Sequence, residues 1–285
     1  MQHGPAVRRR KLGAELRALR ARAGLTSGEA ARLVGWHQSK VSRIETGSSG
    51  AKPSDVRLLL DAYGVDDDEL RDLLLVLAGS QIGGREHWWH AYRGVLPPTY
   101  RDFISLESQA SAMRTLETSV VPGLLQTPAY ARAVTRAAVG AVDEERLDAL
   151  VEVRLARQGV LHAQPPLRLS AVLDEAVLRR EVGGPEVMAQ QLRRLLQAAQ
   201  LPQVRLQVLP FSAGAHVGIT GPFVIFSFPS TSDLDVVVLD NMTSSLYLER
   251  KEDLGAYAEA FNSLRIHALS PEDSLDFIAS LGDGA

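Results

Sequence analysis

The stretch that decides the fold of the N-terminal part is Gly35–Gly47, with the sequence GWHQSKVSRIETG. It is typical of a tight turn that leads into a short helix. Val41 and Ile44 are three residues apart and therefore share one helix face, which we expect to be buried. The outward faces then carry only polar side chains: Gln38, Ser39, Lys40, Ser42 and Arg43. Because Gln and Arg match the hydrogen-bonding edges of adenine and guanine, this helix is predicted to read DNA.

The residues around this stretch predict four further helices. Leu12, Leu16 and Leu19 fall at helical spacing within residues 8–23. Thr26 and Glu29 have the spacing of a capping box, which would start a short helix ending near Val34. Two more helices are expected over residues 53–63 and 66–78. Five short helices, with a glycine turn between the second and third, form a helix-turn-helix arrangement.

Charge is distributed unevenly along the chain. Residues 1–60 hold 12 Lys and Arg against 4 Asp and Glu, a net charge of +8, whereas the remainder carries −11. A basic head on an acidic body is typical of a phosphate-binding domain joined to a domain that does not bind phosphate. A solvated helix face would account for part of the same charge. Nucleic acid is therefore the leading class of partner.

Residues 12–47, LGAELRALRARAGLTSGEAARLVGWHQSKVSRIETG, resemble the phage-repressor and Xre-type helix-turn-helix family. This resemblance implies an ion pair between Arg20 and Glu45. It also implies that one group of side chains contacts DNA: Thr26, Ser27, Gln38, Ser39, Lys40, Ser42 and Arg43. We expect Gln38 and Arg43 to read bases and Lys40 to contact phosphate. Trp36 and His37 depart from the small polar residues common at their positions in the family, and His37 is a mediocre helix cap. Residues 8–11, RRRK, are either a flexible DNA-contacting arm or a frayed terminus.

Residues 79–98 have the composition of a linker between residues 1–78 and a second domain over residues 99–285. His87 and His90, three residues apart and close to Glu86, offer half of a metal site. The absence of cysteine and of an HExxH motif favours an aromatic hinge around Trp88 and Trp89 instead. We expect no metal.

The second domain is predicted to be α+β, with a small and mostly antiparallel sheet. A long helix is expected over residues 100–125, broken by the Val121–Gly123 segment, and another over residues 143–159. The strictly alternating residues 204–209 predict a half-buried strand. Further strands are expected at residues 167–173, 223–228, 236–239 and 245–248, and further helices at residues 185–200, 254–268 and 271–281.

Residues 106–134, LESQASAMRTLETSVVPGLLQTPAYARAV, closely resemble the C-terminal domain of Scr1-type antitoxin-like regulators of filamentous actinobacteria. In that family the domain follows the same kind of helix-turn-helix head. The resemblance implies that the domain receives a small cognate protein partner, often encoded alongside. It also implies a role in development or secondary metabolism.

The chemistry-bearing residues of the second domain favour no enzyme. Gly214, Gly218 and Gly221 match neither a dinucleotide-binding nor a phosphate-binding pattern and are interpreted as turn glycines. Candidate acid–base groups are Asp174, Glu175, His216 and the pair Asp233 and Asp235, for which solvated loop positions are the simpler interpretation. We expect no catalytic residue and no cofactor.

These observations predict a sequence-specific DNA-binding transcriptional regulator, acting as a homodimer on an inverted-repeat operator in double-stranded DNA. The lack of cysteine, of a signal segment and of any long apolar run leads us to expect a cytoplasmic protein that does not enter a membrane. Two alternatives stay open for the second domain. It is a sensor of a small-molecule effector, or it is an enzyme that carries a DNA-binding head.

Overall fold

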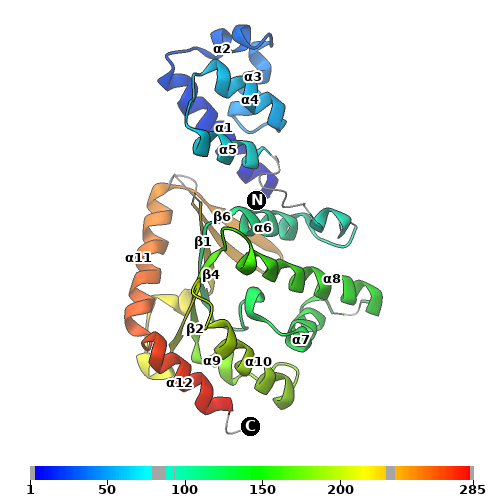
Figure 1. Ribbon diagram of the computed structural model, residues 1–285, viewed down its shortest axis with the longest axis vertical. Helices are drawn as coiled ribbons and strands as arrows, with labels where there is room; N and C mark the ends of the chain where they lie inside the picture. Colours follow the sequence, from blue (N-terminus) through cyan, green and yellow to red (C-terminus); the bar gives the residue numbers. More distant parts are fainter. Residues whose placement is uncertain (1–3, 79–87, 93, 141, 229–234, 283–285) are drawn as a thin grey trace. The chain divides into compact units, whose positions relative to one another are not determined.

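The computed structural model describes residues 4–78, 88–92, 94–140, 142–228 and 235–282 (Figure 1). The described chain forms two compact units that divide between Ala91 and Tyr92. Each unit has its own core, and each is described here by itself. Among the described residues, no helix combines the length and the apolar character that a membrane span requires.

The first unit is helical, as the sequence predicts. Its helices are α1 (Gly4–Arg22), α2 (Ser27–Leu33), α3 (Gln38–Glu45), α4 (Pro53–Ala62) and α5 (Asp68–Leu77). Leu16, Val41, Ile44, Leu59 and Leu74 form the centre of the core, and each is at most 2% exposed. These side chains come from four different helices, so the core fixes α3 against its neighbours.

The close approach of α1 to the end of α3 depends on Gly13. A Cβ atom added to Gly13 would meet the backbone oxygen of Ile44 and would lie 2.6 Å from that of Glu45. Only glycine lacks this atom, so the two helix backbones come closer than any other residue would allow. The contact fixes the C-terminal end of α3.

The second unit alternates helices and strands. After the 3-10 turn η1 (Trp88–Tyr92), its first half contains α6 (Pro98–Gln109), β1 (Ala112–Glu117), η2 (Gly123–Leu125), α7 (Pro128–Val139), α8 (Glu144–Ala156) and η3 (Arg157–His162). There follow β2 (Arg168–Asp174), α9 (Glu175–Arg179), α10 (Pro185–Ala198), β3 (Val204–Leu209), η4 (Phe211–Ala213) and η5 (Val217–Thr220). The unit ends with β4 (Phe223–Ser227), β5 (Val236–Asn241), β6 (Ser244–Leu248), α11 (Lys251–His267) and α12 (Pro271–Gly282).

The sheet is mixed, and the prediction of a mostly antiparallel sheet is wrong. Its six strands lie in the order β3-β2-β1-β4-β5-β6. β1 pairs in parallel with β2, and β2 with β3, whereas β4, β5 and β6 form an antiparallel half. The error arises at β1, which lies inside the helix predicted for residues 100–125. Once β1 is a strand, the helical connections that lead to β2 and then to β3 make these three strands parallel.

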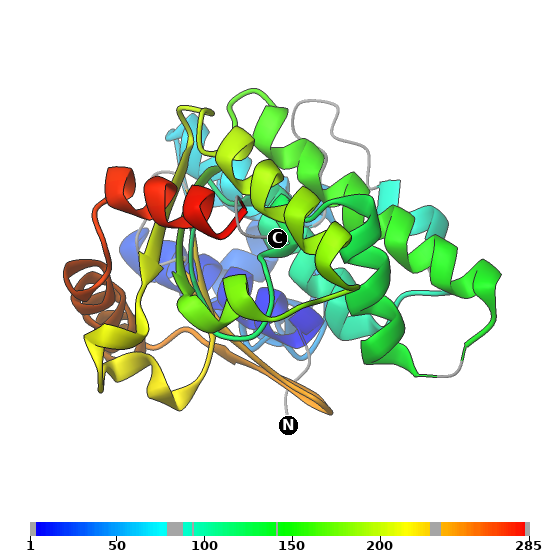
Figure 2. The same ribbon diagram turned by 90° about the horizontal axis from the view of Figure 1, so that it is seen from below.

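Helices cover both faces of this sheet (Figure 1). On one face α11 places Phe261 and Leu264 in a core with Leu116, Phe223 and Ile225. On the other face α6 places Phe103 edge-on to Phe226, with the ring centroids 5.2 Å apart. Helices α10 and α12 pack side by side, and α12 also packs against β3 at the sheet edge (Figure 2).

Candidate nucleic-acid interface

Side-chain caps fix the residues at which α2 and α3 begin. The Thr26 hydroxyl accepts a hydrogen bond from the Glu29 amide at 3.2 Å, and the Glu29 carboxylate accepts one from the Thr26 amide at 2.8 Å. This capping box starts α2. Gly35, with φ +69°, forms the turn. His37 caps α3 through Nδ1, which accepts from the Ser39 amide at 3.3 Å.

Arg20 and Glu45 form a two-pronged ion pair between α1 and α3. The Nε–Oε1 distance is 2.7 Å and the Nη2–Oε2 distance is 2.9 Å, and Arg20 also donates to the carbonyl of Leu25 at 2.6 Å. Hydrogen bonding to Glu45 raises the pKa of Arg20, while burial opposes the shift. The pair therefore joins the end of the recognition helix to α1 and to the start of α2.

The predicted DNA-contacting side chains differ in their surroundings. Gln38, Ser39, Ser42 and Arg43 are exposed along α3. Gln38 donates to the Ser27 hydroxyl at 3.0 Å, so its amide joins the start of α3 to the start of α2. Thr26 is exposed and Ser27 is half-buried at that same end. These six residues thus lie on two consecutive helices and leave polar groups at the surface.

Lys40 does not extend freely into solvent. Its ammonium lies 2.9 Å from Oδ1 of Asp55, at the start of α4, and 3.6 Å from the centroid of the Trp36 ring. The sequence did not indicate the contact with Asp55, which is 15 residues away along the chain.

Residues 8–11 lie within α1, which begins at Gly4, and the predicted flexible arm or frayed terminus is wrong. Arg and Lys are strong helix formers, so this basic run extends the helix instead of interrupting it. Lys11 is buried, which is a further departure from a solvated arm.

The metal-site candidates Glu86 and His87 lie outside the described residues. In η1 the rings of Trp88 and Trp89 pack edge to face, with their centroids 5.7 Å apart. Within the described part of the chain, no group of three or more His, Cys, Asp or Glu side chains is arranged to hold a metal.

The side chains considered as acid–base groups hold backbone and side-chain partners. Asp174 caps α9 by accepting from the Ala176 amide at 2.8 Å, and Glu175 accepts from the Phe211 amide at 2.8 Å. His216 accepts from the Gly218 amide at 3.2 Å at the start of η5. Asp235 accepts from the Ser227 hydroxyl at 2.8 Å. Asp233 lies outside the described residues. Gly214 and Gly221 both have positive φ, in the turns between β3 and β4.

The VPGLLQT segment, residues 121–127, is held by the side-chain amides of three glutamines, of which Gln126 and Gln191 are buried. Gln126 donates to the Val121 carbonyl at 2.7 Å, and Gln158 donates to the Gln126 carbonyl at 2.7 Å. Gln191 of α10 donates to the Leu125 carbonyl and accepts from the Thr127 amide, both at 2.8 Å. Since buried backbone groups need partners, these glutamines fix the segment that follows β1.

A buried ion pair supports the same segment. Arg157 donates from Nε and Nη2 to the Glu107 carboxylate at 2.8 and 2.7 Å, and from Nη1 to the Tyr100 hydroxyl at 2.7 Å. The Arg157 side chain is 6% exposed and that of Glu107 is 1% exposed. A Cβ atom at Gly123 would lie 3.3 Å from the guanidinium. The charge is therefore enclosed between α6 and η2.

Glu117 ends β1 beside this pair. Burial raises the pKa of Glu117 to about 7, against the opposing effects of a hydrogen bond from Thr115 and of the charges on Arg157 and Arg154. Burial lowers the pKa of Arg154, whose Nη1 donates to Gln126 at 3.2 Å. The end of β1 therefore carries a carboxyl group, that of Glu117, with a pKa close to neutral pH.

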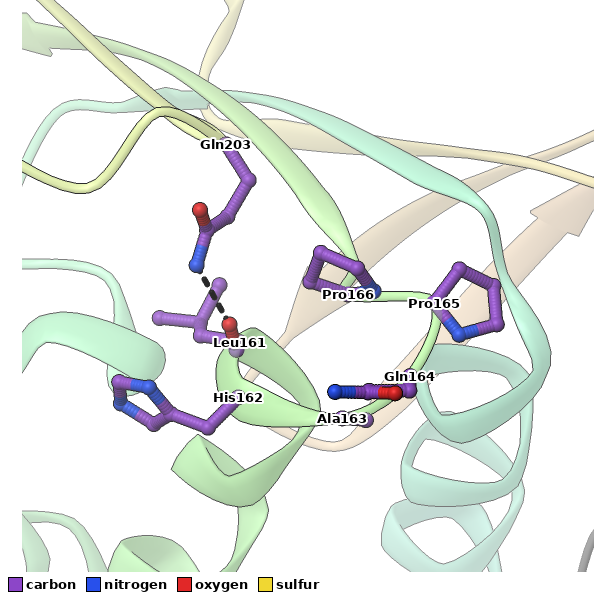
Figure 3. Close-up of a pocket in the computed structure, with 7 residues that line it drawn as sticks. All are labelled: Leu161, His162, Ala163, Gln164, Pro165, Pro166 and Gln203. Carbon is purple, nitrogen blue, oxygen red and sulfur yellow. Dashed lines mark hydrogen bonds between the residues drawn. The ribbon is translucent and has the colours of Figure 1, made fainter.

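An open depression lies at the opposite ends of the parallel strands, before β2 and β3 (Figure 3). It has a volume of about 580 Å³ and is lined by Leu161, His162, Ala163, Gln164, Pro165, Pro166 and Gln203. The Gln203 amide donates to the Leu161 carbonyl at 2.6 Å, so its polar group is already used. The end of η3 and the loops that follow it and precede β3 form the rim, and none of the lining residues is Asp, Glu, Lys or Arg.

Two known protein families match the chain, one over the helical first unit and one over the second unit. Residues 11–74 match a family described as "Helix-turn-helix domain", which with the exposed α3 makes the protein a DNA-binding regulator by class. Residues 100–280 match "Domain of unknown function (DUF5753)", and since they make up more than half of the chain, the protein belongs to that family. Neither a curated protein nor a solved structure matches the chain.

Proposed function

We propose that the protein is a sequence-specific transcriptional regulator in which α3 reads bases in the major groove. The observation that carries the proposal is the exposed polar face of α3, held at the surface by the Arg20–Glu45 pair and the caps of α2 and α3. Arg43 and Gln38 are the base readers. Ser27, Ser39 and Ser42 donate to phosphates, which position a protein on DNA without specifying sequence. Thr26 is left out of this set, because its amide and its hydroxyl both donate to the Glu29 carboxylate.

Selection from a library of random duplexes tests this proposal. The wild type is expected to recover one sequence, and Arg43→Ala is expected to lose discrimination for it by about 5- to 150-fold, which corresponds to about 1–3 kcal/mol for one base-reading pair. Arg146→Ala is the matched control, because Arg146 is exposed on α8 of the second unit. A wild type that recovers no preferred sequence contradicts the proposal.

We also infer that the active form is a homodimer on an inverted repeat. Two-fold symmetric helix-turn-helix proteins place their half-sites about 10–10.5 base pairs apart, or a multiple of that. The selected sequence should therefore be a repeat with that spacing. Sedimentation equilibrium of the protein, alone and with the selected duplex, measures the stoichiometry. One chain per duplex would contradict this arrangement.

For the second unit we propose an antitoxin-like role, in which it receives a small protein partner. Phe211 is 59% exposed and Ile219 is 71% exposed in the connection between β3 and β4, and we assign the docking region to these two apolar side chains. No Asp, Glu, Lys or Arg side chain lines the open depression of Figure 3, so it offers no fixed charge to orient a charged metabolite. Binding of an effector metabolite is the alternative.

Affinity capture from the native host separates the two possibilities. A protein partner, once identified and purified, should bind the wild type and lose affinity for the double variant Phe211→Ser and Ile219→Ser. Ile266→Ser, at a position 81% exposed on α11, is the matched control. If both variants bind the partner equally well, the docking region is wrong. If a metabolite alone changes DNA affinity, the effector alternative replaces the partner.

We infer that the protein acts by binding and not by catalysis. The support is that Asp174, Glu175 and His216 each accept a backbone hydrogen bond that caps or joins local structure. Asp174→Asn keeps an oxygen that caps α9 and should leave regulation of a reporter gene unchanged. Loss of regulation in this variant, with DNA binding and folding intact, would point to an acid–base role.

A further inference from the structure

Lys40 occupies a position at which a free lysine would contact phosphate, yet its ammonium has two partners within the first unit. One is the Asp55 carboxylate at 2.9 Å, and the other is the Trp36 ring, 3.6 Å from centroid to Nζ. The Lys40 side chain is 39% exposed and that of Asp55 is 17% exposed. If Lys40 turned toward a phosphate, it would lose its contacts with Asp55 and Trp36. The half-buried Asp55 carboxylate would then be unpaired near the DNA.

Asp55 is itself fixed. Its Oδ2 accepts a hydrogen bond from the Lys52 amide at 3.2 Å, where α4 begins, and its Oδ1 faces Lys40. The contacts therefore run from the start of α4 through Asp55 and Lys40 to Trp36, in the turn immediately before α3. Trp36 is half-buried, so part of its indole remains at the surface beside the first residues of the recognition helix.

We propose that Asp55 and Lys40 are positioning residues that fix the Trp36 indole, and that the indole contacts the C5 methyl group of a thymine in the operator. Apolar side chains recognise thymine through this methyl group, which no other base of DNA presents in the major groove. The first residues of a recognition helix are those that reach base edges. The inference rests on the proposed DNA-binding function and replaces the phosphate role expected for Lys40.

The charge balance supports positioning over phosphate binding. A lysine paired with an aspartate contributes no net charge to the DNA-binding surface, and so it should release no counterion on binding. Loss of one phosphate contact would lower the slope of log K against log salt by about 0.9. Loss of the charges of both positioning residues would leave that slope unchanged and would reduce sequence preference instead.

The test uses the full chain and the duplex that the wild type recovers from the random library. Each thymine of a half-site is replaced in turn by uracil, which removes only the methyl group. For the wild type, one replacement should weaken binding about fourfold, the factor expected for burial of one methyl group. The double variant Lys40→Met with Asp55→Asn, which leaves the net charge of the surface unchanged, should lose this sensitivity and keep the salt slope, whereas Lys40→Arg, which keeps the charge, should retain both.

Asp55→Asn gives an independent result, because its side-chain oxygen can still accept from the Lys52 amide while the charge is lost. Lys40 is then released, so the salt slope should steepen by about 0.9 and the uracil sensitivity should disappear. Lys52→Met is the matched control, an exposed lysine at the same helix start. Thermal unfolding of each variant checks that the first unit is folded.

Two outcomes overturn the inference while leaving the proposed function intact. In the first, the double variant Lys40→Met with Asp55→Asn flattens the salt slope by about 0.9 and keeps the uracil sensitivity, which makes Lys40 a phosphate contact. In the second, the wild type recovers a specific duplex in which no thymine is sensitive to uracil. A wild type that recovers no specific duplex refutes the proposed function itself.

Discussion

Replacing Glu107 with Leu removes the carboxylate that balances Arg157 inside the second unit. The Arg157 side chain, which is 6% exposed, would then keep its hydrogen bond to the Tyr100 hydroxyl but would have lost its counter-charge. Breaking a buried pair on one side costs about 3–5 kcal/mol, because it leaves an uncompensated buried charge. Arg157→Met leaves the opposite charge and should cost a similar amount. Either loss is a large part of the roughly 5–15 kcal/mol that stabilises a typical domain.

The double variant Glu107→Leu with Arg157→Met shows whether the lost stability comes from an unpaired buried charge or from changed packing. With both residues apolar, no buried charge remains, and we expect a cost of only about 1–2 kcal/mol. Most of that cost reflects the Tyr100 hydroxyl, which loses a hydrogen bond of about 1 kcal/mol. The sum of the two single costs should therefore exceed the cost of the double variant by at least about 4 kcal/mol. Tyr100→Phe alone should cost about 1 kcal/mol.

Hydrogen exchange at the amides of β1 and α8, followed by mass spectrometry, measures these free energies within the second unit. It is preferable to a single melting curve, because a chain of two units need not unfold in one step. Arg146→Met, at an exposed position of α8, should change protection by no more than about 0.5 kcal/mol. Single costs below about 1 kcal/mol, or costs that simply add in the double variant, would refute the argument that this charge is enclosed.

Three further predictions concern pH, packing and capping. The pKa of Glu117 lies at about 7 in the folded protein against an ordinary value of 4.5, so the folded state favours the protonated acid. Its contribution to stability is complete below pH 4.5 and is lost as pH rises through 7, by at most about 3.5 kcal/mol at about 1.4 kcal/mol per pKa unit. Glu117→Gln should remove that part of the pH dependence of hydrogen exchange, and an unchanged pH profile would contradict the shift. Gly13→Ala should cost the first unit about 1–3 kcal/mol and lower operator affinity. Gly28→Ala, where the nearest atom would lie 4.0 Å away, should be neutral or stabilising in the same thermal melt. Thr26→Ala should cost about 1 kcal/mol in that melt and Thr26→Ser much less, and equal losses would mean that the hydroxyl does not cap α2.

The helix-turn-helix could be predicted because its signals are local. A capping box needs only Thr26 and Glu29, and the buried face of α3 needs only Val41 and Ile44 at helical spacing. The strand β1 could not be found in this way. Residues 112–117, AMRTLE, have no alternation that distinguishes them from the preceding helix, and their pairing with β2 and β4 decides their structure.

The sequence also did not predict which side chains the site residues contact. Residue type and helix position indicated that Lys40 faces outward, but Asp55 lies 15 residues further along the chain. The Arg157–Glu107 pair joins residues 50 apart, and Gln191 reaches the VPGLLQT segment from 64 residues away. Such contacts follow from the fold as a whole, so a local pattern predicts which side chains are available but not which side chain each one meets.

The contact between Gly13 and the backbone oxygens of Ile44 and Glu45 has a mechanical consequence. Because no side chain separates α1 from the end of α3, the two backbones are in direct contact, and neither helix can tilt against the other. The recognition helix α3 therefore moves together with α1 as one rigid body. In the homodimer proposed above, a signal from the second unit would act on the position of α1 and α3 together, and so on which half-site spacings two chains can span. The affinity of one head for one half-site would stay the same.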